Sequence, residues 1–109
     1  MKIITFHDRI NIDELLDHIR KNLAPLFMEQ RKRALDFIVE KTGDTIEISQ
    51  PELYGEEILF RIEVKGSELW MTRSEHYVDD VNSLTVESIL NDLFNDVSGK
   101  LGTDLLQEG

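Results

Sequence analysis

The chain has 109 residues, a formal net charge of −10 and no cysteine. This length indicates one domain that can bury a two-layer core, and the missing cysteine excludes disulfides and cysteine-ligated metals. No segment approaches the ~18 apolar residues of a membrane span. The opening eight residues are too short and too soon charged for a signal peptide, so we expect a cytoplasmic protein with no membrane partner.

The charge is unevenly spread along the chain. Residues 75–109 hold eight acidic side chains and one basic, whereas residues 1–41 are nearly balanced. Nucleic-acid binding needs a basic footprint. The one basic cluster consists of Arg20, Lys21 and residues 31–33, and it has acidic neighbours on the same expected helix. We therefore expect no nucleic-acid partner.

The first long element is a predicted helix that begins after Asn11. Asn11 is a good N-cap, Glu14 stands in the capping-box position, and an apolar stripe follows at helical spacing. Pro25 either kinks this helix or starts a second one. We expect helix on both sides of it, ending at Thr42-Gly43 with Gly43 as the left-handed residue beyond the helix. An edge strand at residues 2–6 is an open alternative.

Three strands are predicted next. Residues 44–49 alternate apolar and polar side chains, and residues 50–55 form a loop that contains Pro51 and Gly55. Residues 57–73 then indicate a β-hairpin, because two alternating runs flank Gly66-Ser67, a two-residue loop suited to a type II′ turn.

The turn fixes the register of the hairpin and therefore its two faces. The face expected in the core carries Phe60, Ile62, Val64, Leu69 and Met71. The opposite, polar face carries Leu59, Arg61, Glu63, Lys65, Glu68, Trp70 and Thr72.

Trp70 is the only tryptophan, and this register places it on the polar face. Arg61 and Lys65 lie diagonally across from it, within reach of a cation–π contact. One interpretation is that their aliphatic stems, or a helix, merely cover the ring. The other is that Trp70 marks a binding surface, since tryptophan and arginine are enriched at binding hot spots. Its candidate residues are Trp70, Arg61, Leu59, Glu63, Lys65 and Thr72.

The C-terminal part is predicted as a polar segment, a helix over 85–97 capped by Thr85, and a flexible tail at 103–109. Residues 1–102 then form a single α+β domain. We expect a two-layer sandwich, in which an antiparallel three-stranded meander is packed on one face by an N-terminal kinked or broken helix and a C-terminal helix.

A metal site is a weaker candidate in the polar segment. Glu75, His76, Asp79 and Asp80 form its densest cluster of oxygen and nitrogen ligands. They follow neither the EF-hand spacing nor another ordered ligand pattern, so a solvated acidic loop is the competing interpretation.

Catalytic signatures are missing from the sequence. There is no cysteine nucleophile, no Gly-x-Ser-x-Gly and no phosphate loop, so we expect no enzyme and no cofactor. The small acidic character and the helix–meander–helix order are similar to several α+β binding folds, including type III secretion chaperones. No motif carries this resemblance, so it assigns no residue a role.

Three functions remain as hypotheses. The first is a non-enzymatic protein–protein interaction module that forms a homodimer through the open sheet face. The second is an acidic inhibitor, of the antitoxin or DNA-mimic kind, in which residues 75–82 and the helix over 85–97 bind a basic partner. The third is a small-ligand or divalent-metal site at residues 75–82.

Overall fold

A sheet of six strands, counted over the described residues, is the centre of the fold. The computed structural model describes residues 2–6, 9–74, 80–101 and 106–108, with the side chains of 2–6, 9–74 and 80–95. In chain order the elements are β1 (Lys2–Thr5), α1 (Ile12–Arg31), β2 (Ile38–Thr42), β3 (Thr45–Ser49), α2 (Pro51–Tyr54), β4 (Ile58–Lys65), β5 (Glu68–Arg73), α3 (Val81–Leu101) and β6 (Leu106–Glu108). The strand order across the sheet is β2-β3-β4-β5-β1-β6, and all pairings are antiparallel.

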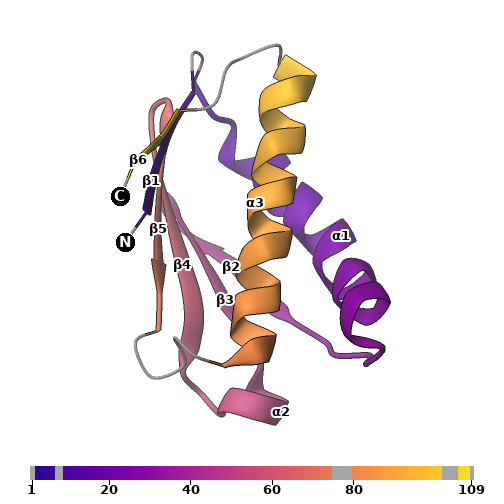
Figure 1. Cartoon of the computed structure of the whole chain (residues 1–109). Coiled ribbons are helices and arrows are strands. Elements are labelled where there is room, and N and C mark those ends of the chain that lie inside the picture. Colours follow the sequence, from indigo (N-terminus) through magenta and orange to yellow (C-terminus); the bar gives the residue numbers. More distant parts are fainter. Residues whose placement is uncertain (1, 7–8, 75–79, 102–105, 109) are drawn as a thin grey trace.

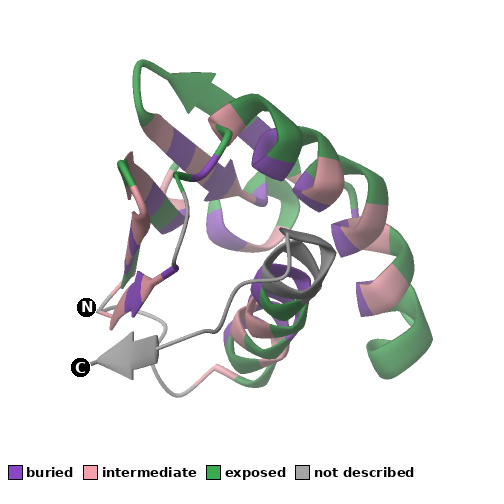
Figure 2. Ribbon diagram, turned by 90° about the horizontal axis from the view of Figure 1, so that it is seen from above, coloured by how far each residue is buried: buried purple, intermediate pink, exposed green. Residues whose placement is uncertain are grey.

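The two long helices cover the same face of the sheet (Figure 1). They also contact each other, so the helices form one layer and the strands the other. Buried positions alternate with half-buried ones along β3 and through most of β5, and Figure 2 shows purple and pink bands on the strands. This is the pattern of a sheet with one face in the core. The predicted α+β two-layer sandwich is confirmed, and its sheet has more strands than the predicted meander.

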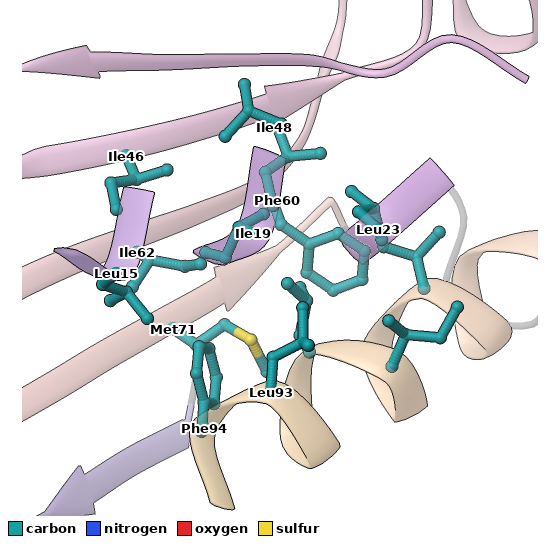
Figure 3. Close-up of a cluster of buried hydrophobic side chains, with 14 of the residues drawn as sticks. Leu15, Ile19, Leu23, Ile46, Ile48, Phe60, Ile62, Met71, Leu93 and Phe94 are labelled. Atoms are coloured by element: carbon teal, nitrogen blue, oxygen red, sulfur yellow. The ribbon is translucent and has the colours of Figure 1, made fainter. Parts of the chain in front are cut away.

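The core fills the space between the layers (Figure 3). Its central side chains are at most 2% exposed and come from both helices and three strands: Leu15, Ile19, Leu23, Ile46, Ile48, Phe60, Ile62, Met71, Leu93 and Phe94. Burying each such side chain contributes about 1.5–3 kcal/mol of transfer free energy, so this cluster holds the helices on the sheet.

The central hairpin has the predicted register throughout, from Phe60 opposite Arg73 to Lys65 opposite Glu68. Gly66 has φ 63°, as the first central position of a type II′ turn requires. The segment after β1 holds this turn in place. The backbone N–H of Phe6 donates to the carbonyl of Ser67, and that of Ile10 donates to the carbonyl of Gly66.

The first helix ends earlier than predicted. Pro25 lies inside α1 without dividing it, and the helix ends at Arg31, where Lys32 adopts the left-handed conformation and donates its N–H to the carbonyl of Met28. The expected helix up to Thr42-Gly43 is wrong, because residues 38–42 form β2. The β-branched residues of this segment favour a strand, and β2 pairs directly with β3.

The C-terminal helix, α3, begins earlier than predicted. Asp80 precedes α3, and its carboxylate accepts a hydrogen bond from the N–H of Ser83 at 2.9 Å, which is the N-cap interaction. Thr85 is therefore not the cap but lies within the first turns, where its hydroxyl donates to the carbonyl of Val81. In the expected tail at 103–109, residues 106–108 form β6 beside β1, and the other tail residues lie outside the described residues.

Candidate functional site

The sheet face opposite the helices is the candidate site, and we call it the outer face. In the described part of the chain, no helix or strand covers it (Figure 1). It consists of the strand side chains that alternate away from α1 and α3. Around β5 these are Ile3, Thr5, Glu47, Arg61, Glu63, Lys65, Glu68, Trp70 and Thr72.

Trp70 lies well inside this face, because β5 has neighbouring strands on both sides. It stands between Glu63 on β4 and Ile3 on β1 in the strand register, and it is only half-buried. Its indole Nε1 donates to Glu68 at 3.3 Å, and the Lys65 ammonium lies 3.8 Å from the ring centroid. Both predictions, a tryptophan on the polar face and a cation–π contact, are confirmed.

The cations of the outer face are paired within the chain. Arg61 binds Glu47 of β3, with its Nη2 and Nε at 2.8 and 3.1 Å from one carboxylate oxygen. Lys65 Nζ lies 3.7 Å from the Glu63 carboxylate. Such exposed pairs contribute at most about 1 kcal/mol each, and each places a carboxylate beside a cation of the outer face.

Leu59 does not belong to this face, and the prediction that placed it there is wrong. Its side chain is 0% exposed. The ladder between β3 and β4 shifts at this point, since Ile48 pairs with Phe60 and Ser49 pairs with Ile58. Leu59 is thus the extra residue of a β-bulge, which breaks the strict alternation of faces and lets both Leu59 and Phe60 enter the core.

Asp80 is the only member of the candidate metal cluster among the described residues. Asp80 is the N-cap of α3, where its carboxylate accepts the N–H of Ser83. The same carboxylate oxygen also accepts a hydrogen bond from the Tyr54 hydroxyl. Glu75, His76 and Asp79 lie outside the described residues. Among the side chains that are described, no group of three His, Cys, Asp or Glu residues is placed to hold a metal ion.

Two residues of the outer face were missed by sequence reasoning. Ile3 lies directly opposite Trp70, and Glu47 binds Arg61. An edge strand at residues 2–6 was an open alternative, but β1 lies inside the sheet, between β5 and β6. Strand neighbours that are distant in sequence leave no local signal, so Ile3 was not placed beside Trp70. The alternation over residues 44–49 placed Glu47 on the polar side of its strand, and only its pairing with Arg61 was missing.

Comparisons with models of protein families, with curated proteins and with solved structures found no match. Within the described residues, none of the helices is both long and apolar enough to cross a membrane.

Proposed function

We propose that this chain is a non-enzymatic protein–protein interaction module that forms a homodimer through the outer face. One observation carries the proposal: a half-buried tryptophan lies on a helix-free sheet face next to an isoleucine, with charged side chains around it. Interfaces have the same anatomy, with an aromatic centre and a polar rim. A cytoplasmic location, expected from the sequence, is part of this proposal.

The charges of the outer face favour a second copy as the partner. A face of a single charge would repel its own copy, whereas this face carries both signs. Arg61 and Lys65 each lie beside a glutamate of the same chain. With Glu68, the charged side chains around Trp70 are three glutamates and two cations, so each copy brings a net charge of only −1 to a two-fold interface.

Trp70 is the only tryptophan, so its fluorescence emission reports on the outer face. We expect light scattering to give twice the chain mass at high micromolar concentration, and the emission of Trp70 to shift to shorter wavelength as the dimer forms. Trp70→Ala should abolish the association. Met28→Ala is the matched control, since Met28 is 54% exposed on α1, on the other side of the molecule.

A monomeric mass over the whole concentration range would refute the homodimer. A dimer that persists in Trp70→Ala would move the interface away from the outer face.

The acidic-inhibitor hypothesis has less support. Of the acidic side chains described in its segment, Asp80 caps α3 and Glu87 binds Arg73 at 3.1 Å. Charges that are engaged within the chain are less available for a basic partner. Asp92 remains exposed on α3, so the hypothesis now depends mainly on residues outside the described part.

A further inference from the structure

The strand β2 is an open edge of the sheet. It is the first strand in the sheet order, so among the described strands only β3 pairs with it. The hairpin between them closes with Thr42 opposite Thr45. In a two-residue hairpin the two residues of the closing pair exchange backbone hydrogen bonds, and every second pair along the ladder does so too. Val39 and Lys41 are the intervening residues, so they turn their backbone N–H and C=O groups away from β3.

A side chain of α1 occupies one of these outward groups. Arg20 Nε donates to the carbonyl of Val39 at 2.9 Å. Arg20 follows the fully buried Ile19, so it lies at the border of the buried stripe of α1, and α1 contacts β2. An additional strand would use the Val39 carbonyl as its acceptor. The guanidinium must therefore leave before another strand can pair there.

Glu40 opposes the pairing of two copies at the same edge. The antiparallel pairing that uses both outward residues places Val39 of one copy opposite Lys41 of the other. Glu40 then lies directly opposite Glu40 of the second copy. Like charges in directly opposite positions destabilise a strand pair.

We infer that Arg20 is an edge guard: its hydrogen bond to Val39 prevents β2 of a second copy from extending the sheet. Exposed edge strands invite such pairing, and natural sheets protect them with charged side chains. Glu40 acts in the same direction. This inference concerns a different surface from the outer face and stands whether or not the proposed homodimer exists.

Two variants of equal charge and similar length test the guard. Arg20→Met removes the donor, whereas Arg20→Gln keeps an amide nitrogen at the same position along the side chain as Arg Nε. Both are made in the Trp70→Ala background, so that association through the outer face does not contribute. We expect concentration-dependent association of Arg20→Met by light scattering, and none of Arg20→Gln. If Arg20→Met does not fold, Arg20→Ala replaces it.

Amide hydrogen exchange identifies the surface that associates. Pairing at the edge should protect the N–H groups of Val39 and Lys41 and leave that of Glu40 unchanged, because Glu40 already faces β3. The inference is overturned if the folded donor-free variant keeps the same mass as Arg20→Gln. It is also overturned if that variant associates without added protection at Val39 and Lys41.

Discussion

At the scale of single residues, Asp80 links two elements that are distant in the sequence. One carboxylate oxygen accepts the Ser83 N–H at the start of α3 and the hydroxyl of Tyr54 in α2. Tyr54 is 8% exposed, and a buried hydroxyl gains from a charged acceptor. Asp80, a member of the candidate metal cluster, therefore has a structural role, because it joins α2 to the start of α3.

Asp80→Ala should lower the free energy of unfolding by about 1–3 kcal/mol, because it removes an N-cap and an acceptor of a buried hydroxyl. Asp92→Ala, on the exposed side of the same helix, should stay within about 0.5 kcal/mol. Urea unfolding measures both. Equal effects of the two variants would contradict the capping role, and a smaller loss in Asp80→Ala when Tyr54→Phe is already present would measure their coupling.

The candidate site was predictable where it depended on local pattern. The alternation around Trp70 and the turn beside it were enough to place the indole on the polar face. Leu59 was misplaced because an extra residue in a strand changes the face without changing the hydrophobic pattern. Ile3 could not be assigned, because its partner strand lies far away in the sequence.

At the scale of elements, the two tight hairpins are built alike. Gly43 has φ 60° and Gly66 has φ 63°, and each is the first residue of a two-residue loop. For Gly43 the sequence signal was interpreted as a helix end, which requires the same positive φ. The residue was identified correctly as left-handed, but two different structures satisfy that requirement.

Gly66→Ala should destabilise the protein by about 1–2 kcal/mol, because an L-residue pays a steric cost at positive φ. Nothing lies within 4 Å of a Cβ built at Gly66, so the loss comes from the backbone and not from a clash. Ser67→Ala, at the next position of the turn, is the control and should change little. If thermal unfolding shows no difference between the two variants, the turn does not depend on glycine.

The segment after α1 shows why part of the fold escaped prediction. Ala34, Leu35 and Ile38 have a spacing that fits a helix, and Ile38, Val39 and Thr42 have side chains that fit a strand. The segment is too short for its pattern to distinguish a helix from a strand. The left-handed Lys32 and the pairing with β3 decide for a strand, and neither is visible as a motif.

At the scale of the whole molecule, the chain carries a net charge of −10. Salt should therefore affect the homodimer and the binding of a basic partner differently. A dimer centred on the indole should persist in ~1 M salt, where charges are screened beyond about 3 Å. Capture of a basic partner should weaken steeply under the same conditions. Light scattering at low and high salt, with Trp70→Ala in parallel, checks this expectation. Dissociation of the homodimer by salt alone would contradict an apolar centre.

The position of β1 has a consequence for the order of folding. Strands β2 to β5 pair with their sequence neighbours, so those ladders can form by closing short loops. β1 lies between β5 and β6, which are both distant from it in the sequence. Pairing with either strand closes a very long loop, and the chain entropy is lost before the stabilising contacts form. Among the described strands, we therefore expect the meander of β2 to β5 to form first and β1 to pair with it later.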